Sequence, residues 1–211
     1  MTIRAASVLV VFLVALVASA ASAQWQRTKT VAEAKFKGSG PGGFKMEGKT
    51  DAVKVVDRAD SITILVDLTN LTTGIELRDD HMRNKYLEVE KYPLTTLVVK
   101  KSALKMLDEQ GFVAGEAKGH YTLHGKTLEV PFKYSGNCDA AMVCQVSGEM
   151  KLNFNQFGIV VPKYMGITLK PDIVVTTTFA VRQMPGAPAV PTQRTQTTQS
   201  TQSTPTTTST L

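Results

Sequence analysis

The three histidines of the chain, His81, His120 and His124, are the side chains best suited to acid–base or metal chemistry. His120 and His124 are four positions apart and share one face of a predicted strand. A zinc or iron site would need carboxylates or cysteines close to such a pair. The sequence contains no HExxH motif, no nucleophile elbow and no phosphate-binding glycine loop. We therefore predict no catalytic residue and no metal site, with a histidine-dependent enzyme as an alternative.

Two cysteines, Cys138 and Cys144, could serve as reactive thiols or could bond to each other. Their separation is not that of a redox CxxC motif. The neighbouring residues Gly136, Asn137 and Asp139 favour a turn between them. In an oxidising compartment, so close a pair can staple a hairpin loop. We predict a structural disulfide, with a reactive thiol pair as the alternative.

A cluster of charged side chains lies in TGIELRDDHMRNKYLEVEKYP, residues 73–93, which holds nine charged residues in twenty-one positions. The alternation typical of strands is absent from residues 77–87. Acidic residues come first and cations last, as the helix dipole favours, and Asp79 and Arg83 form an i,i+4 pair. We predict one or two helical turns here, between the two flanking strands, and expect these turns to cap the barrel.

Two roles are open for this predicted cap. As a lid over one end of the barrel, it would bring Arg78, His81 or Tyr86 to the head group of a ligand. As a structural cap, it would form salt bridges and satisfy loop carbonyl groups through Arg78, Asp79, Asp80 and Arg83. We favour the structural role for the charged residues and expect Met82 and Tyr86 to contact a ligand.

The two ends of the chain differ in composition from the middle. Residues 1–23 combine Arg4, an apolar run and small residues at Ala21 and Ala23, which is the pattern of a cleaved secretory signal. We predict an exported protein of the periplasm, with cleavage near Ala23. Residues 185–211 are rich in Thr, Gln, Ser and Pro, which predicts a disordered tail. The intervening residues 24–184 have the length of one domain.

The net charge of the chain is +6, to which Arg4 and Arg194 outside the predicted domain contribute two charges. Within the domain, lysines alternate with acidic residues instead of clustering. This distribution argues against a nucleic-acid partner and is compatible with a transient contact with a membrane surface. Nothing in the sequence indicates the oligomeric state.

Alternation of apolar and polar residues dominates the predicted domain. It is clearest at 144–154, where Val146, Met150 and Phe154 alternate with Gln145 and Glu149. Alternation of this length indicates an antiparallel sheet with one buried face. The tight connections favour a meander, and the long strands favour closure as a barrel over a sandwich. We predict strands at 36–37, 44–56, 61–68, 94–105, 111–124, 127–134, 144–154 and 172–183.

The predicted inner face mixes bulky aromatic residues with glycines and methionines. Glycine leaves volume unfilled or lets a strand bend, and methionine adapts its shape to a soft ligand. The pattern therefore fits a hollow barrel and, equally, a filled core with glycines at barrel corners.

Three segments, in order, resemble the YceI-like family of polyisoprenoid-binding, lipocalin-like periplasmic proteins. Residues 73–93 resemble its TG, RD-x-HLR and EKYP pattern. GHYTLHGKTLEVPF, residues 119–132, resembles its G-x-LT-x-HG-x-T hairpin, and FNQFGI, residues 154–159, resembles its N-x-x-DFGI segment. The resemblance covers about residues 43–181. The chain departs from it in the first strand, which lacks the usual aspartate and histidines, and at Gln156, where aspartate is common.

The resemblance implies an all-β fold, an eight-stranded antiparallel lipocalin-like barrel with a short helical cap around residues 77–87. The barrel would hold an isoprenoid-type lipid, such as a quinone tail or a polyprenyl chain, and no cofactor besides it. We expect that lipid to contact side chains of the barrel interior and mouth: Phe44, Met46, Ile62, Ile64, Val66, Met82, Tyr86, Tyr121, Leu123, Val130, Phe132, Val146, Met150, Leu152, Phe154, Phe157 and Phe179.

We therefore predict a non-enzymatic periplasmic carrier or store of an isoprenoid or other long-chain lipid. The first alternative is a histidine-dependent enzyme that acts on an amphiphile inside the barrel. The second is a structural or adhesive module without a ligand, held by the C-terminal tail.

Overall fold

The structure is a computed structural model that describes residues 24–28, 32–164 and 166–184. The predicted signal peptide, residues 1–23, and the predicted tail, residues 185–211, lie outside the described residues. In the described part of the chain, no helix has the length and apolar character needed to cross a membrane.

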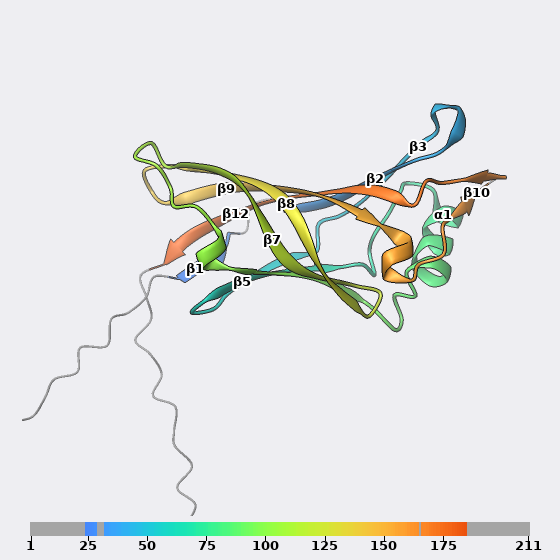
Figure 1. Cartoon of the computed structure of the whole chain (residues 1–211), viewed down its shortest axis with the longest axis horizontal. Helices are drawn as coiled ribbons and strands as arrows, with labels where there is room; N and C mark the ends of the chain where they lie inside the picture. The colour runs from blue at the N-terminus through green and yellow to red at the C-terminus, as the bar shows by residue number, and fades with distance from the viewer. Residues whose placement is uncertain (1–23, 29–31, 165, 185–211) are drawn as a thin grey trace, which may run out of the picture. The chain divides into compact units, whose positions relative to one another are not determined.

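One antiparallel sheet of ten strands makes up most of the described chain (Figure 1). Its strands are β1 (Gln24–Arg27), β2 (Glu33–Ser39), β3 (Lys45–Thr50), β4 (Val53–Asp57), β5 (Ser61–Asp67), β6 (Leu94–Lys100), β7 (Phe112–Leu123), β8 (Lys126–Cys138), β9 (Val143–Asn153) and β12 (Asp172–Met184). A separate hairpin comprises β10 (Lys163–Tyr164) and β11 (Ile167–Thr168). The helical elements are α1 (Glu76–Asp80), a π-helix η2 (His81–Tyr86), and the 3₁₀ turns η1 (Pro41–Gly43), η3 (Lys101–Ala103) and η4 (Phe154–Phe157).

The strand order closes the sheet into a barrel. Nine strands follow the order β3-β2-β12-β9-β8-β7-β6-β5-β4, and β1 pairs with the end of β12. The two outermost strands, β3 and β4, are separated in the chain only by Asp51 and Ala52. Because so short a link holds the two edges together, the sheet must curve round on itself. The predicted lipocalin-like antiparallel barrel is confirmed.

The strand count differs from the predicted eight because one predicted strand, residues 44–56, is broken in two. Its first part, β3, pairs with β2, and its second part, β4, pairs with β5. The break at Asp51 and Ala52 lets the chain change partner where the barrel closes. The short strands β1, β10 and β11 were also not predicted, since two to four residues are too few to show a periodic pattern.

Each long strand sends alternate side chains into the barrel. On β9, Met150 and Leu152 are buried while Gln145 and Glu149 are exposed. Strand β12 pairs with β9 along eleven residues, and β7 pairs with β8 along twelve, so these four strands form the most continuous wall of the barrel.

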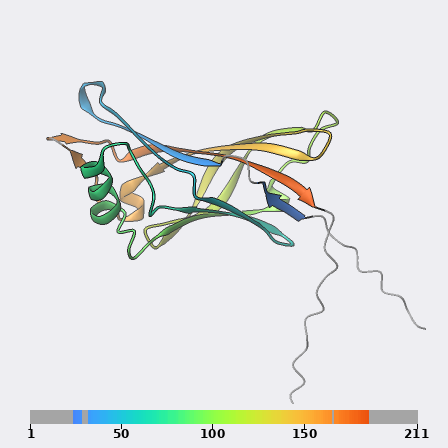
Figure 2. The same ribbon diagram turned by 180° about the vertical axis from the view of Figure 1, so that it is seen from behind.

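The two ends of the barrel are built differently (Figures 1 and 2). The cap end carries α1, η2, η4 and the β10–β11 hairpin. The loop end carries the connection from β6 to β7, residues 101–111, here called the β6–β7 loop, and the turn between β8 and β9. The predicted helical cap around residues 77–87 is confirmed, as α1 followed directly by η2.

Candidate ligand-binding site

The interior of the barrel contains a cavity of about 300 Å³. Its wall extends from Met82 in the cap to Trp25 and the Cys138–Cys144 pair at the loop end. Among the lining residues that the structure describes, only Lys35 and Lys105 carry a charged side chain. An elongated, apolar and almost uncharged cavity is suited to a hydrocarbon chain and unsuited to a polar metabolite.

The structure brings most of the predicted contact residues together around this cavity. Those that line it are Met46, Ile62, Ile64, Val66, Met82, Tyr86, Tyr121, Leu123, Phe132, Val146, Met150, Leu152, Phe154 and Phe179. They come from β3, β5, η2, β7, β8, β9, η4 and β12, so the cavity depends on closure of the whole barrel. Their contact with a lipid remains a prediction.

Three predicted contact residues lie outside the cavity lining: Phe44, Val130 and Phe157. Phe157 is completely buried and packs edge-on against Tyr121, with ring centroids 5.9 Å apart. Val130 is buried opposite Gly119 in the β7–β8 pair, and Phe44 precedes β3 at the cap end. Phe157 and Val130 therefore contribute to packing behind the cavity wall.

Several lining residues were not predicted, although the alternation of inward and outward residues along the strands could have identified them. In β6, Thr95, Leu97 and Val99 alternate with outward residues and all three line the cavity. In β12, Ile173 and Val175 do the same. Their period-two pattern could have placed them on the inner face. Trp25 could not be found this way, because β1 is only four residues long.

The polar groups inside the cavity are mostly satisfied by the barrel itself. Thr95 Oγ1 donates a hydrogen bond to Thr122 O at 2.7 Å, and Thr50 Oγ1 donates to Asp67 O at 3.2 Å. Burial raises the pKa of Tyr121 to about 12, a shift that a hydrogen bond with Thr95 opposes. The Tyr121 phenol is therefore neutral at physiological pH, so it adds no charge to the cavity wall.

The cap is held by a buried carboxylate, Asp79 in α1. Its Oδ2 accepts a hydrogen bond from Thr72 Oγ1 at 2.5 Å, and its Oδ1 accepts from Thr73 N at 2.6 Å and from Thr73 Oγ1. Burial raises the pKa of this carboxyl, but these hydrogen bonds and the positive charge of Arg83 outweigh burial and lower the pKa below its usual value. Asp79 thus ties the cap to the segment that follows β5.

The two arginines of the cap donate to loop carbonyl groups, as the structural interpretation predicted. Arg78 Nη2 donates to Thr73 O at 2.9 Å and its Nε to Thr73 Oγ1 at 2.7 Å, while Arg83 Nη1 donates to Thr69 O at 3.3 Å. Gly74 follows with a φ of +80°, a conformation that favours glycine. The Thr-Gly pair of the sequence motif therefore serves to fasten the cap.

Tyr86 joins the cap to the cavity. Its ring lines the cavity, and its hydroxyl accepts a hydrogen bond from Lys163 N at 3.1 Å and donates to Lys163 O at 3.2 Å. Met82 is buried beside it, and both also border a much smaller pocket of about 20 Å³ near Arg78 and His81. Tyr86 and Met82 are therefore placed to contact whatever occupies the cap end of the cavity.

None of the three histidines lines the main cavity. His81 and His120 are exposed. His124 follows β7, with Nδ1 3.4 Å from Phe157 O and Nε2 3.3 Å from Glu88 Oε1, and its ring lies against Tyr92. In residues 24–28, 32–164 and 166–184, no three His, Cys, Asp or Glu side chains are grouped as metal ligands would be. All three histidine side chains are therefore absent from the wall of the main cavity.

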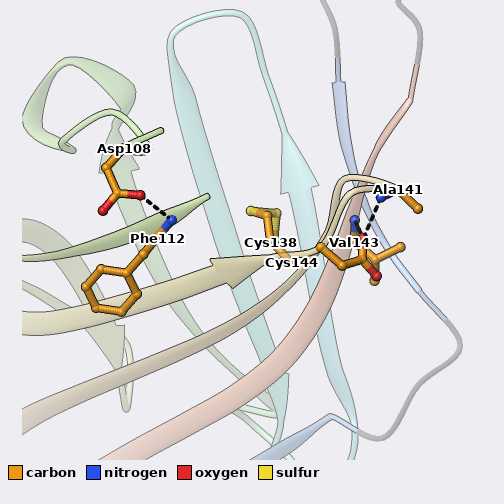
Figure 3. The surroundings of a disulfide bond; sticks show 7 residues. Asp108, Phe112, Cys138, Ala141, Val143 and Cys144 are labelled. Carbon is orange, nitrogen blue, oxygen red and sulfur yellow. Dashed lines mark hydrogen bonds between the residues drawn. A yellow bond between two sulfur atoms is a disulfide. The ribbon is translucent and has the colours of Figure 1, made fainter. Parts of the chain in front are cut away.

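The predicted disulfide between Cys138 and Cys144 is present at the loop end (Figure 3). The two cysteines are register partners in the β8–β9 pair. Between them, Asp139 Oδ1 accepts hydrogen bonds from Ala141 N and Val143 N, both at 2.9 Å. The bond therefore closes the hairpin at its tip, and both cysteines also line the cavity.

Comparison with known proteins agrees with this architecture. A model of the YceI-like domain matches residues 16–182. A polyisoprenoid-binding domain from Saccharophagus degradans, implicated in plant cell wall breakdown, superimposes with a TM-score of 0.63 at 15% identity, covering 77% of this chain and 100% of that one. The BcnA protein of Burkholderia cenocepacia gives a TM-score of 0.55 at 14% identity, covering 71% of this chain and 95% of that one.

No curated protein sequence matches the chain significantly. The structural likenesses, at such low identity, establish the shared fold. The family match extends over most of the chain and includes the three motifs, the barrel and the cap described above. The chain therefore belongs to the YceI-like family, as its motifs predicted.

Proposed function

We propose that this protein is a non-enzymatic carrier or store of an isoprenoid-type lipid, which it holds extended in the barrel cavity. The observation that carries the proposal is the cavity itself, which runs between the two ends of the barrel and is lined almost throughout by apolar side chains. A hydrocarbon chain gains about 0.8 kcal/mol for each methylene group that leaves water for such a surface. The domain from Saccharophagus degradans, with the same fold, is described as polyisoprenoid-binding, which supports this ligand class.

We also propose that the protein acts outside the cytoplasm, in the periplasm. The signal-like sequence of residues 1–23 supports export. The Cys138–Cys144 disulfide supports an oxidising compartment, because such bonds rarely persist in a reducing cytosol. The histidines, which lie away from the cavity wall, favour binding over catalysis.

Extraction of the purified protein tests the proposal directly. The protein is expressed with its natural leader, purified from the periplasm without detergent, and extracted with organic solvent for mass spectrometry. We expect an isoprenoid quinone or polyprenyl compound at a substantial fraction of the protein concentration. Protein that is folded, monodisperse and free of extractable lipid, and that also fails to take up N-phenyl-1-naphthylamine, would overturn the proposal.

A matched pair of variants on β9 separates cavity binding from surface binding. Gly148 lines the cavity, and a Cβ at this position would have only Lys133 O nearby, at 3.8 Å. Gly148→Leu therefore fits sterically at its first carbon and projects its methyl groups into the cavity. Gln145→Leu adds the same side chain on the exposed face of the same strand. We expect at least a tenfold loss of dye affinity in Gly148→Leu and less than a twofold change in Gln145→Leu.

A further inference from the structure

The wall of the barrel is incomplete between β6 and β7. These neighbours pair only through Thr96–Val98 of β6 and His120–Thr122 of β7. On the loop-end side of this contact, β7 has another eight residues, Phe112–Gly119, which pair in register with β8 on the other side of β7. The described residues of β6 form no register pair with that part of β7. The two strands therefore diverge toward the loop end and leave one flank of β7 without a strand.

The β6–β7 loop covers this divergence. Leu104 and Leu107 are half-buried, pack against the core and line the cavity, together with Val113 of β7. Met106, between them, points outward and is 90% exposed. The loop thus presents two apolar side chains inward as a plug, which closes the flank that strand pairing leaves open.

Among the described residues, one hydrogen bond fastens the middle of this loop to another strand: Lys105 N donates to the hydroxyl of Tyr134 in β8 at 2.8 Å. Tyr134 reaches the loop by crossing β7 at Gly115, its register partner. A Cβ on Gly115 would lie 2.8 Å from the Tyr134 hydroxyl oxygen and 3.0 Å from Cζ, which is too close. The absence of a side chain at Gly115 is therefore what allows Tyr134 to reach Lys105.

Both ends of the loop are fixed more firmly than its middle. At the start, Lys101 Nζ forms an ion pair with Asp57 at 2.5 Å, and Lys101 N donates to Asp60 O at 2.8 Å. At the C-terminal end of the loop, Asp108 Oδ1 accepts hydrogen bonds from Gln110 N at 3.0 Å and from Phe112 N at 2.7 Å. Two fixed ends around a weakly held apolar middle are the arrangement of a hinged flap.

The cap end offers a ligand a more costly opening. There Asp79 accepts three hydrogen bonds, Arg78 and Arg83 donate three more, and Tyr86 binds Lys163 through two. Opening the middle of the β6–β7 loop breaks one hydrogen bond to another strand and exposes two leucines that an entering hydrocarbon would cover again. Of these two openings, the one through the flank of the barrel is the less costly.

We propose that the ligand enters and leaves sideways, between β6 and β7, through a portal that the β6–β7 loop covers and the Tyr134 hydroxyl latches. This inference rests on the proposed lipid-binding function and adds the route by which the lipid is exchanged. The latch controls the rate of exchange. Tyr134 also lines the cavity, but Tyr134→Phe keeps its ring in place, so the affinity should change less than the rates.

Stopped-flow exchange of N-phenyl-1-naphthylamine, with phosphatidylcholine vesicles as acceptor, tests the portal. Tyr134→Phe removes only the latch hydroxyl. Gly115→Ala keeps the hydroxyl, but its added methyl group, on the neighbouring strand β7, displaces the Tyr134 ring. We expect each variant to raise the association and dissociation rates about fivefold, as loss of one hydrogen bond allows, with the dissociation constant within twofold. The double variant should exchange no faster than either single one, because both break the same bond.

Two controls separate the portal from general loosening and from entry at the cap. Gly38→Ala is a strand glycine whose added Cβ would meet Ile173 and Leu169 at an ordinary 3.8 and 3.9 Å, and its exchange rates should match the wild type. Tyr86→Phe removes the corresponding hydroxyl at the cap and should change exchange by a smaller factor than Tyr134→Phe. Faster exchange in Gly38→Ala, or a larger effect in Tyr86→Phe, would overturn the portal.

Amide hydrogen exchange of residues 101–111 in the empty protein gives a readout that needs no ligand. Both latch variants should exchange faster in this segment, and unchanged protection would refute the latch. If the wild-type protein binds the dye but both latch variants exchange it at the wild-type rate, the portal fails and the lipid-binding function stands. If the wild-type protein binds neither dye nor lipid, the proposed function fails and the portal fails with it.

Discussion

Each end of the barrel buries one aspartate, but the two aspartates join different kinds of neighbours. Asp79 at the cap end is bound by Thr72 and Thr73, seven and six positions away in the chain. Asp57 at the loop end, with a side chain only 2% exposed, accepts a hydrogen bond from Trp25 N at 2.7 Å and pairs with Lys101. Its partners lie in β1 and η3, far from β4 in sequence.

The difference shows how the two ends acquire their structure. Most of the hydrogen bonds that fasten the cap lie within residues 69–86, whereas those of Tyr86 with Lys163 reach a distant segment. The loop end is assembled from β1, β4 and η3, which meet only when the barrel closes. Phe157 and Asp79 at the cap end are deeply buried, whereas Phe112 and Lys101 at the loop end are partly exposed. We expect substitutions of the buried cap-end residues to reduce stability most, and substitutions at the loop end to affect local opening more than global unfolding.

The largest difference between the ends should come from a matched pair of phenylalanines. Phe157 at the cap end is completely buried, whereas Phe112 at the loop end is 46% exposed. We expect Phe157→Ala to lower the free energy of unfolding by about 3–5 kcal/mol, because it removes a packed aromatic ring and leaves a void. Phe112→Ala should cost about 1 kcal/mol or less in the same urea titration. Equal losses would contradict the proposed contrast.

Alkaline pH should weaken the packing behind the cap through Tyr121. Burial raises the pKa of its phenol to about 12, so between pH 10 and 12 the unfolded chain loses this proton while the folded protein retains it. The contribution of Tyr121 to the free energy of unfolding is therefore fully present below pH 10. It falls by roughly 2–3 kcal/mol as the pH rises to 12. Urea titrations at a series of pH values measure the loss. In Tyr121→Phe, the part of the decline caused by this group should disappear.

The two buried aspartates provide a third test. Asp79→Asn should cost about 2 kcal/mol, because a charged acceptor of three hydrogen bonds becomes neutral. Asp57→Asn should cost about 1 kcal/mol, since its partner Lys101 is partly solvated, but it should speed amide exchange in residues 101–111. The reverse ranking, or faster loop exchange in Asp79→Asn, would show that the ends are not independent.

Asp79 also makes the cap sensitive to acid. The pKa of Asp79 is lowered in the folded protein, so its contribution to stability is present above the unfolded pKa, near 3.8. That contribution is lost as the pH falls through the lower, folded pKa. Acid titration of Asp79→Asn should lack this component of the wild-type decline.

The last comparison concerns the disulfide at the loop end. Cys138 and Cys144 are six positions apart, so the bond closes a short loop and should contribute at most about 2 kcal/mol. The double variant Cys138→Ser/Cys144→Ser should keep the barrel and fray the β8–β9 turn. Thermal unfolding and amide exchange of residues 138–144 measure the two effects. Loss of the fold would show that the loop end is more central to stability than its contacts indicate.

The long strands were predictable because each carries its own signal. In β9, Met150 and Leu152 alternate with Glu149 and Lys151, and this pattern fixes the buried face before any partner is known. The predicted strand 44–56 ran across the link at Asp51 and Ala52, where the buried positions change from even-numbered (Met46, Thr50) to odd-numbered (Val53). Closure of the barrel, and no local preference, decides that β3 and β4 take different partners.

The cavity lining was predictable to the same extent as the strands. Phe132 and Met150 line it as their inward positions predicted, whereas Phe157, also predicted to contact the ligand, lies outside the lining and packs against Tyr121. Which inward side chains meet each other and which meet a void depends on distances across the barrel. A single sequence carries no such distance.

The sequence by itself determined the alternating faces of the long strands, the cap at residues 76–86, the cysteine pair and the family to which the chain belongs, because local periodicity and short motifs specify these features. Only the tertiary structure decided that the interior is hollow, that β6 and β7 separate, and that Tyr134 crosses Gly115 to hold the loop. The physical reason is that voids, gaps and latches arise from the fit between segments distant in the chain. No segment encodes that fit alone.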